Sequence, residues 1–189
     1  MPELVLASAS PQRLELLAQI GIVPDVIEAA DLNESTHTGE MPRKHAARLA
    51  EGKAKSIATK YPHAWVLGAD TVVACGRRIL PKAENAETAK ACLETLSGRR
   101  HRVYGGISVV LPSGKTRTRM VETRVRFKRL ERMEVEAYLT CEEWRGKAGG
   151  YAIQGRAAAF VADLNGSYSN VVGLALFEVS ALLREHLSI

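Results

Sequence analysis

Residues 4–13 have the sequence LVLASASPQR, in which an apolar run meets a turn of small residues and then a proline. A short continuous apolar run is typical of a strand that is buried on both faces. Ser10 before Pro11 predicts a helix N-cap with proline at the first helical position. An apolar stripe over 12–20 continues this helix, and Gly21 ends it. The segment therefore predicts a strand, a tight turn and a helix.

Strand-like and helix-like patterns mix along the rest of the chain, without internal repeats or a linker. This mixture predicts an α/β fold, with a single domain over 1–189 and a mixed sheet flanked by helices. A polar stretch over 31–41 and a glycine-rich stretch over 146–150 are expected to be loops. We expect further strands over 23–28, 65–74, 102–111, 116–128 and 157–162, and further helices over 42–60, 84–96, 133–139 and 171–187.

The composition is that of an ordinary globular protein. Of 189 residues, 46% are hydrophobic and 25% are charged, which argues against disorder and collagen-like repeats. No apolar run approaches the ~20 residues of a membrane span, and the first residues lack the basic region of a signal peptide. Three widely spaced cysteines, Cys75, Cys92 and Cys141, indicate reduced thiols rather than disulfides or a zinc site. We therefore expect a cytoplasmic protein with no membrane partner.

The charge balance favours an anionic ligand without choosing which one. The chain has 26 basic and 21 acidic residues, a formal net charge of +5. Arg124, Arg126 and Lys128 alternate with apolar residues, which places them on the solvent-facing side of an edge-like strand. A solvated face is the favoured interpretation. A nucleic-acid patch that also includes Arg117 and Arg119 is the alternative, although an aromatic content of 5% offers little stacking surface.

The turn after the first strand is a candidate anion site. Free backbone N–H groups and the helix dipole at a helix N-terminus attract negative charge. Ser8, Ser10 and Arg13 add two hydroxyls and a guanidinium there, which can hold a triphosphate through charge-assisted hydrogen bonds. The alternative is that this sequence is a plain helix cap.

Asp70 is the second candidate, because it lies in the middle of the apolar strand expected over 65–74. A carboxylate is costly to bury there unless it is paired or binds a metal. Suitable roles are a Mg²⁺ ligand and a group that positions a nucleophilic water, and a structural hydrogen bond is the alternative. Gly68 and Ala69 are small enough to let a ligand approach the backbone.

Three further charged residues look ordinary when each is taken alone. Lys53 lies on the helix expected over 42–60, Lys82 follows Pro81 after the strand that carries Asp70, and Glu34 lies in the polar loop. A surface position is the default interpretation for each.

Glycines on both sides of Gln154 predict a buried amide that backbone or ligand can approach closely. A glutamine can donate and accept hydrogen bonds at once, which suits the edge of a nucleobase. The polar loop over 165–173 can bind phosphate or cap the last helix. His and Cys residues nowhere have the spacing of a zinc site.

Several short motifs occur in a fixed order along the chain, and together they resemble the Maf family (septum formation inhibitor Maf) of nucleoside triphosphate pyrophosphatases. The resemblance covers essentially the whole chain. The motifs are Ser8-Ala9-Ser10-Pro11-Gln12-Arg13, Gly68-Ala69-Asp70-Thr71-Val72-Val73, Ser97-Gly98 with His101 and Val103, Lys147-Ala148-Gly149 with Gln154-Gly155, and Gly166-Ser167-Tyr168-Ser169-Asn170-Val171-Val172-Gly173-Leu174.

The resemblance implies a mixed, curved sheet and a deep central cleft between two lobes, similar to the inosine triphosphate pyrophosphatase fold. It implies hydrolysis of a nucleoside triphosphate to the monophosphate and pyrophosphate, with Mg²⁺ or Mn²⁺, and a possible homodimer. It also implies a role for each candidate residue. Ser8 and Arg13 bind phosphate, Glu34 is an acidic cleft residue, Lys53 and Lys82 clamp the phosphates, Asp70 is the catalytic carboxylate and a metal ligand, and Gln12, Thr71 and Gln154 contact the substrate.

Thr71 together with Gln154 resembles the branch of the family that acts on dTTP and UTP. That branch usually has Arg at the position of Gln12. The family's His-x-Val-x-Thr motif begins here at His101, and its threonine is replaced by Gly105. These departures leave the base preference open. The alternatives are the same chemistry on 7-methyl-GTP or another non-standard nucleotide, and a non-catalytic nucleotide-binding regulator of cell division.

Overall fold

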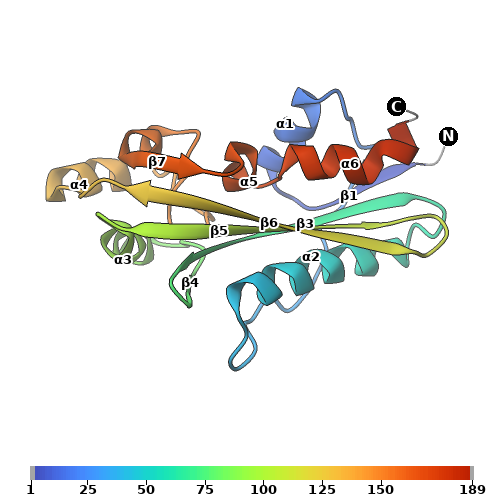
Figure 1. Ribbon diagram of the computed structural model, residues 1–189, viewed down its shortest axis with the longest axis horizontal. Helices are drawn as coiled ribbons and strands as arrows, with labels where there is room; N and C mark the ends of the chain where they lie inside the picture. Colours follow the sequence, from blue (N-terminus) through green and yellow to red (C-terminus); the bar gives the residue numbers. More distant parts are fainter. Residues whose placement is uncertain (1–2, 188–189) are drawn as a thin grey trace.

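A mixed sheet of seven strands runs through the centre of the molecule in a computed structural model that describes residues 3–187 (Figure 1). Its strand order is β2-β1-β3-β5-β6-β7, and β4 pairs with β3 outside this path. β1 runs parallel to β2 and β3, and the other pairs are antiparallel. The expected α/β fold with a mixed sheet is confirmed. The strands are β1 (Leu4–Ala7), β2 (Val26–Ile27), β3 (Trp65–Cys75), β4 (Arg78–Leu80), β5 (Arg100–Val110), β6 (Thr116–Phe127) and β7 (Val161–Asn165).

Helices lie on both sides of this sheet. In Figure 1, α2 lies below the sheet, whereas α1, α5 and α6 lie above it. The other two helices, α3 and α4, lie at the end of the sheet that is farther from the termini. No helix within 3–187 is long and apolar enough to cross a bilayer. The helices are α1 (Pro11–Gln19), α2 (Pro42–Ala58), α3 (Ala86–Leu96), α4 (Arg132–Thr140), α5 (Tyr168–Val172) and α6 (Leu176–Leu187), with a 3₁₀ helix η1 (Arg156–Phe160).

The first strand is apolar throughout because both of its faces are covered. Leu4 and Leu6 pack in a cluster with buried side chains of α1 and α6, whereas Val5 and Ala7 pack in a cluster with α2. This is the alternation expected for successive residues of a strand. A third cluster joins α3 and α4 to the far ends of β5 and β6. The core thus has two layers at one end of the sheet and a separate cluster at the other.

One edge of β3 is left open in the middle of the molecule. β1 pairs with β3 only as far as Ala7 opposite Gly68, and β4 begins to pair only at Val73. Within the described chain, the stretch 69–72 therefore has no strand partner on that edge. This opening contains Asp70 and its neighbour Thr71, whose side chains point to opposite faces of the sheet.

Two glycines bring α2 unusually close to the sheet. A Cβ atom added to Gly68 would lie 2.5 Å from the carbonyl oxygen of Ala50, and one added to Gly106 would lie 2.3 Å from that of Ala46. The space beside Gly68 is therefore filled by helix backbone. Our interpretation that Gly68 leaves room for a ligand is wrong, because hydrophobic patterning does not show which element lies over a glycine.

Near the C-terminus two predicted elements are wrong. The strand expected over 157–162 is instead η1 followed by β7, because the small residues of Arg156–Phe160 form a 3₁₀ turn first. The single helix expected over 171–187 is interrupted: α5 ends at Val172, Gly173 takes a φ of 148°, and α6 begins at Leu176. Only glycine adopts such a φ without strain. β4 was not predicted, and β2 is shorter than the strand expected over 23–28.

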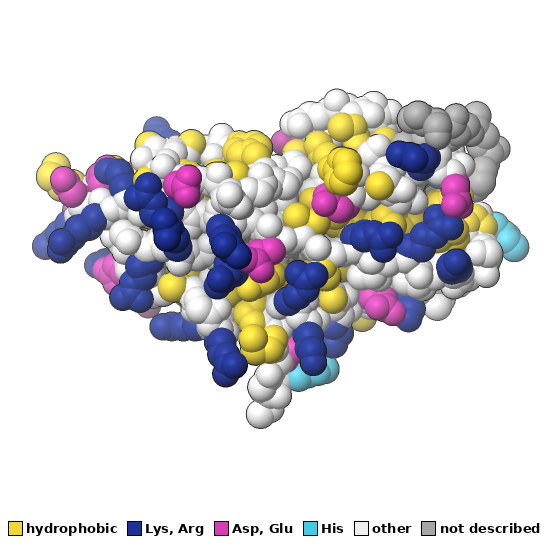
Figure 2. All heavy atoms as spheres, in the orientation of Figure 1, with side chains coloured by type: hydrophobic (Ala, Val, Ile, Leu, Met, Phe, Trp, Pro, Cys, Tyr) yellow, Lys and Arg dark blue, Asp and Glu magenta, His cyan; other side chains and the backbone are white. Residues whose placement is uncertain are grey.

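The basic residues of β6 do not lie on an edge. Arg124 is in register with Asn165 of β7, and Arg126 with Asp163. The prediction that these arginines lie on an edge strand is therefore wrong. It failed because β7 follows a 3₁₀ turn and carries no clear strand pattern. Both arginines remain exposed, and Figure 2 shows acidic side chains among the many Lys and Arg side chains of the visible face. Ion pairs join Arg117 to Glu185, Arg124 to Glu122 and Lys128 to Glu134.

Candidate active site

Arg13 ties together three distant parts of the chain at the open edge of β3. Its Nη1 donates to the Ser8 hydroxyl at 2.9 Å, its Nε to the carbonyl oxygen of Gly173 at 3.0 Å, and its Nη2 to the Thr71 hydroxyl at 3.3 Å. The side chain is buried. Burial lowers the pKa of Arg13, the charges of Asp70 and Glu34 oppose that shift, and a guanidinium stays ionised in proteins. The site therefore contains a fixed, buried cation.

The turn between β1 and α1 begins the helix as expected but uses its serine differently. Ser10 occupies the N-cap position, yet its side chain makes no capping hydrogen bond. Its hydroxyl instead donates to Oε1 of Gln12 at 3.3 Å. Pro11 has no N–H, and the N–H groups of Arg13 and Leu14 donate to the carbonyl oxygen of Ser10. Within the described residues, the N–H of Gln12 is therefore the first-turn donor that stays available to an anion.

Four charged side chains from four parts of the chain form one connected line. The Lys53 ammonium, on α2, lies 2.7 Å from Oδ1 of Asp70 on β3 and 2.6 Å from Oε1 of Glu34. The other oxygen of Glu34 lies 2.6 Å from the ammonium of Lys82, just after β4. Asp70 is 4% exposed and Lys53 is 7% exposed, so this pair is buried while Lys82 is exposed.

Glu34 stays ionised because it bridges the two lysines. Partial burial opposes its charge, but hydrogen bonds from Lys53 and Lys82, together with their positive charges, outweigh burial and lower the pKa of Glu34 to about 2. The loop that carries Glu34 is therefore held against both α2 and the segment after β4 by charge-assisted hydrogen bonds. Our default interpretation of Lys53 as a surface residue is wrong. Glu34 is half-exposed, but it is paired with two lysines and is not a lone acid of the loop.

Three hollows meet at Lys82, which lines all of them. We call them the basic hollow, the carboxylate hollow and the amide hollow. The basic hollow is lined by Ser8, Ser10, Arg13, Glu34 and Lys53; the carboxylate hollow by Glu34, His45, Leu49, Asp70 and Leu80; and the amide hollow by Gln12, Thr71, Lys147, Tyr151, Gln154, Val171 and Val172.

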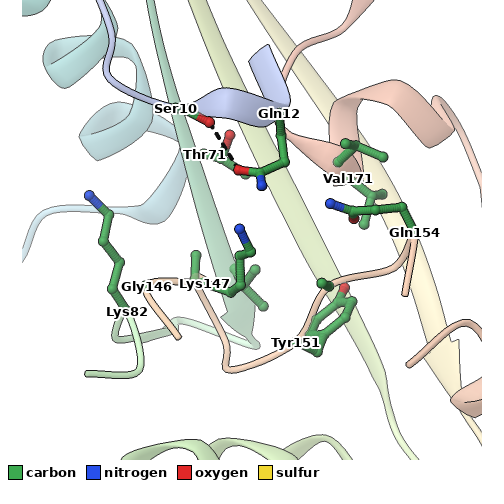
Figure 3. Close-up of a pocket in the computed structure, with 13 residues that line it drawn as sticks. Ser10, Gln12, Thr71, Lys82, Gly146, Lys147, Tyr151, Gln154 and Val171 are labelled. Atoms are coloured by element: carbon green, nitrogen blue, oxygen red, sulfur yellow. Dashed lines mark hydrogen bonds between the residues drawn. The ribbon is translucent and has the colours of Figure 1, made fainter. Parts of the chain in front are cut away.

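The amide hollow is shown in Figure 3. Gln12 points into it from α1, and the amide of Gln154 extends toward it from the opposite side. Gln154 is exposed, so the expectation of a buried amide is wrong: the flanking glycines turn the chain but do not cover the side chain. Thr71 also lines this hollow, and its hydroxyl donates to the carbonyl oxygen of Gly173 at 3.3 Å.

Comparison with known proteins identifies the family. A family model described as Maf-like protein matches residues 3–186. The chain belongs to the Maf-like protein family. The resemblance inferred from the sequence motifs is therefore confirmed, and it extends over nearly the whole chain.

Relatives with known names resemble this Maf-like chain closely. A Rhodospirillum rubrum protein named dTTP/UTP pyrophosphatase is 63% identical over 180 residues, which cover 95% of this chain and 86% of the relative. A Paramagnetospirillum magneticum protein of the same name is 60% identical over 183 residues, or 97% of this chain and 96% of the relative. Among solved structures, a HAM1 protein from Coxiella burnetii has a TM-score of 0.54 at 18% identity and covers 98% of this chain and 100% of its own. That structure shows that the fold is shared.

The Maf-like chain also places His45, which Glu40 holds, in the same hollow as Asp70. Nδ1 of His45 lies 2.8 Å from Oε2 of Glu40, and Arg48 donates to both oxygens of Glu40. The Arg48 hydrogen bonds outweigh burial and hold the pKa of Glu40 well below its usual range. This group was not predicted, and the spacing of Glu40, His45 and Arg48 around the start of α2 is its only signal in the sequence.

Two further residues of the amide hollow were missed as single residues. Lys147 lines it, although in the sequence this residue stood out only as part of a motif. The hydroxyl of Tyr151 lies 2.8 Å from Nε2 of His101, which is buried and packs against the rings of both Tyr151 and Phe127. His101 thus supports the wall of the hollow from behind.

The oxygen donors of the site are of the kind that a hard divalent cation prefers. Lys53 occupies Oδ1 of Asp70, and no described side chain binds Oδ2. Within 3–187, no group of three or more His, Cys, Asp or Glu side chains is placed to hold a metal ion. Mg²⁺ commonly binds through one or two carboxylates together with substrate phosphates. Asp70 and Glu34 are the carboxylates that fit this arrangement.

Proposed function

We propose that the protein is a nucleoside triphosphate pyrophosphatase that hydrolyses dTTP and UTP to the monophosphate and pyrophosphate. The observation that carries this proposal is the buried Asp70–Lys53 pair at the open edge of β3, beside a second buried cation, Arg13. The names of the relatives that are 63% and 60% identical support the choice of substrates.

The basic hollow is assigned to the triphosphate. A nucleoside triphosphate carries several negative charges, and cations must neutralise the charge that moves onto the leaving pyrophosphate. Arg13, Lys53 and Lys82 line this hollow together with the hydroxyl of Ser8. Because Arg13 and Lys53 are held by hydrogen bonds to the protein, they are already in place before the nucleotide binds.

The reaction assigned to this site is attack of water on the α-phosphorus. A new bond forms between the water oxygen and the α-phosphorus, the bond from that phosphorus to the bridging oxygen breaks, and pyrophosphate leaves with its electron pair. Oδ2 of Asp70, which Lys53 leaves free, accepts a proton from the water. Asp70 and Glu34 would hold a divalent cation together with the nucleotide, and such a cation would supply further positive charge at the phosphate oxygens.

The amide hollow is assigned to the nucleoside. Uracil and thymine present carbonyl oxygens and a ring N–H on one edge, and a glutamine amide can match both. Gln12 and Gln154 offer two such amides, while Val171 and Val172 supply apolar contacts. Thr71 acts on the nucleoside indirectly, through Arg13, since its hydroxyl is already bonded to Arg13 and Gly173.

We further propose that the two ends of the sheet form lobes that enclose the nucleotide. The homodimer and the cytoplasmic location stay predictions.

The test is pyrophosphate release from a panel of triphosphates, with Mg²⁺ or Mn²⁺ present. The panel holds dTTP, UTP, CTP, ATP, GTP and 7-methyl-GTP. We expect release from dTTP and UTP, and we expect Asp70→Asn to lower it by about 100- to 10,000-fold. The variant should remain folded, because its amide is close to isosteric with the carboxylate and Lys53 retains Glu34 as a partner.

Two outcomes would overturn the proposal in different ways. Release only from 7-methyl-GTP or a purine nucleotide would keep the chemistry and reject the assigned substrates. Tight nucleotide binding without release of pyrophosphate from any of them would reject the enzyme and favour a nucleotide-binding regulator.

A further inference from the structure

The loop that carries Lys147 is fastened to the segment that carries Lys82. The N–H of Gly146 donates to the carbonyl oxygen of Ala83 at 2.8 Å, and the N–H of Ala83 donates back to that of Lys147 at 3.1 Å. Lys82 itself forms an antiparallel bridge with Ala148. These backbone hydrogen bonds fix where the Lys147 side chain begins, at the edge of the hollow that this side chain lines.

The Lys147 ammonium is half-buried and has no anionic partner. Partial burial lowers its pKa, and the negative charge of Glu15 on α1 acts weakly in the other direction. Across residues 3–187, Lys147 forms no ion pair, whereas Lys53 and Lys82 in the same site each contact an acid. A partly desolvated cation without a counter-charge is costly, and a bound anion relieves that cost.

The location of Lys147 indicates which part of a nucleotide it would meet. Lys82 lines both the basic hollow and the amide hollow, whereas Lys147 lines the amide hollow alone. In Figure 3, the nitrogen of Lys147 points toward Gln12 on the opposite wall, between Lys82 and Gln154. A triphosphate that extends from the basic hollow past Lys82 would therefore reach Lys147 at the phosphate nearest the nucleoside.

We propose that Lys147 binds the α-phosphate of the nucleotide, a contact that rests on the proposed function. It supplies positive charge facing the first turn of α1, where Gln12 is neutral. A full negative charge satisfies an isolated ammonium better than a neutral carbonyl of the base does. Lys147 is thus a substrate-binding residue for phosphate and not a reader of the base.

The test measures how Lys147→Met changes affinity for three ligands that divide the nucleotide into parts. Methionine keeps an unbranched side chain and leaves the backbone hydrogen bonds of the loop intact. By calorimetry with Mg²⁺ present, we expect affinity for UMP to fall by about 10- to 100-fold, the usual size of a charge-assisted contact. Affinity for pyrophosphate and for uridine should change by less than about twofold, and Lys147→Arg should retain most of the UMP affinity. The control is Lys90→Met, an exposed lysine of α3 that lines none of the three hollows, which should change nothing.

A second variant places the charge on the opposite wall. Gln12→Arg in the Lys147→Met background should recover most of the lost UMP affinity, because the new guanidinium faces the same space. Turnover of dTTP and turnover of UTP should fall by the same factor in Lys147→Met. Both should recover by the same factor when Gln12→Arg is added.

Either of two results would overturn the proposal: unchanged UMP affinity in Lys147→Met, or an equal loss for UMP and uridine, which would make Lys147 a base-contacting residue. Failure of the proposed function would look different. A wild-type protein that releases no pyrophosphate but loses UMP affinity in Lys147→Met would reject the activity and keep the phosphate contact.

Discussion

Lys53 and Lys82 contact the same carboxylate, yet they should matter to the protein in different ways. Lys53 is buried against Asp70 and Glu34, and Lys82 is exposed and contacts Glu34 alone. Removing one partner of a buried ion pair leaves an uncompensated charge, whereas an exposed pair contributes little to stability.

We therefore predict that Lys53→Met lowers the free energy of unfolding by about 3 kcal/mol, and that Lys82→Met lowers it by less than about 1 kcal/mol. Both should reduce kcat, Lys82→Met by about 100-fold, because each removes a cation from the triphosphate. Urea unfolding and steady-state kinetics on the same two preparations check this. Equal losses of stability would contradict the different burial of the two lysines, and a Lys82→Met effect on KM alone would make Lys82 a ground-state binder.

His101 should make the protein sensitive to mild acid. Burial lowers the pKa of His101 to about 4, below its ordinary value of 6.5. Between these values the unfolded chain binds a proton that the folded protein excludes. The contribution of neutral His101 to the free energy of unfolding is therefore complete above pH 6.5 and is lost as the pH falls toward 4.

We predict that unfolding free energy drops by about 2 kcal/mol more between pH 7 and pH 5 in the wild type than in His101→Gln. Glutamine does not titrate and is long enough to reach the Tyr151 hydroxyl. Urea titrations of both proteins at the two pH values give the comparison. Parallel losses in the two proteins would show that another group causes the acid sensitivity.

At the scale of elements, the contact between α2 and β3 decides whether the site can assemble. Lys53 reaches Asp70 from a helix whose backbone nearly touches Gly68. Overpacking at such a contact forces backbone to move.

We predict that Gly68→Ala lowers the free energy of unfolding by about 1–3 kcal/mol and also lowers kcat, because α2 carries Lys53 away from Asp70. Gly52→Ala is the matched control: a Cβ atom there meets only the tip of Leu32, at 3.1 Å, and alanine favours the helix by roughly 1 kcal/mol. Thermal unfolding of both variants is the measurement. A Gly68→Ala protein with wild-type stability and kcat would contradict the close packing.

Local patterns predicted the elements whose signals are contained in a short segment. The strand, turn and helix over 4–21 are present as expected, because the apolar run, Pro11 and Gly21 act within that segment. Patterns failed where the deciding partner is distant: β7 forms only beside β6, and the helix break at Gly173 coincides with a carbonyl that binds Arg13, 160 positions earlier.

Some residues of the candidate site could be predicted from the sequence, and others could not. Asp70 could be singled out because a carboxylate in an apolar strand is unusual. Lys53, Glu34 and Lys82 became candidates only through the family resemblance, since Lys53 is 17 positions from Asp70 and Glu34 is 48 from Lys82. His45, Lys147 and Tyr151 were not predicted as site residues, because only the fold brings them to the same hollows.

Across the whole molecule, the site spans both faces of the sheet through the opening beside β3. Asp70 faces the side of α2, and Thr71 contacts Arg13 and Gly173 on the other side. A nucleotide in this opening would contact α1, α2 and the loop after α4 at once. Ligands that bind only the folded state raise its stability.

We predict that chelation stops turnover without changing the melting temperature, because no described group of three ligands holds a metal without nucleotide. Mg²⁺ alone should leave the melting temperature within about 1 °C, whereas UMP or pyrophosphate together with Mg²⁺ should raise it by several degrees. Thermal scans with each addition test this. A large rise with Mg²⁺ alone would reveal a metal site already formed in the free protein.

The central claim is that this site directs water to the α-phosphorus of a pyrimidine nucleoside triphosphate. Hydrolysis of UTP in water enriched in heavy oxygen tests it most directly, with mass analysis of both products. The account predicts one heavy oxygen in UMP and none in pyrophosphate, because the bond broken lies between the α-phosphorus and the bridging oxygen. Heavy oxygen in pyrophosphate and none in UMP would place the attack on the β-phosphorus and contradict the account.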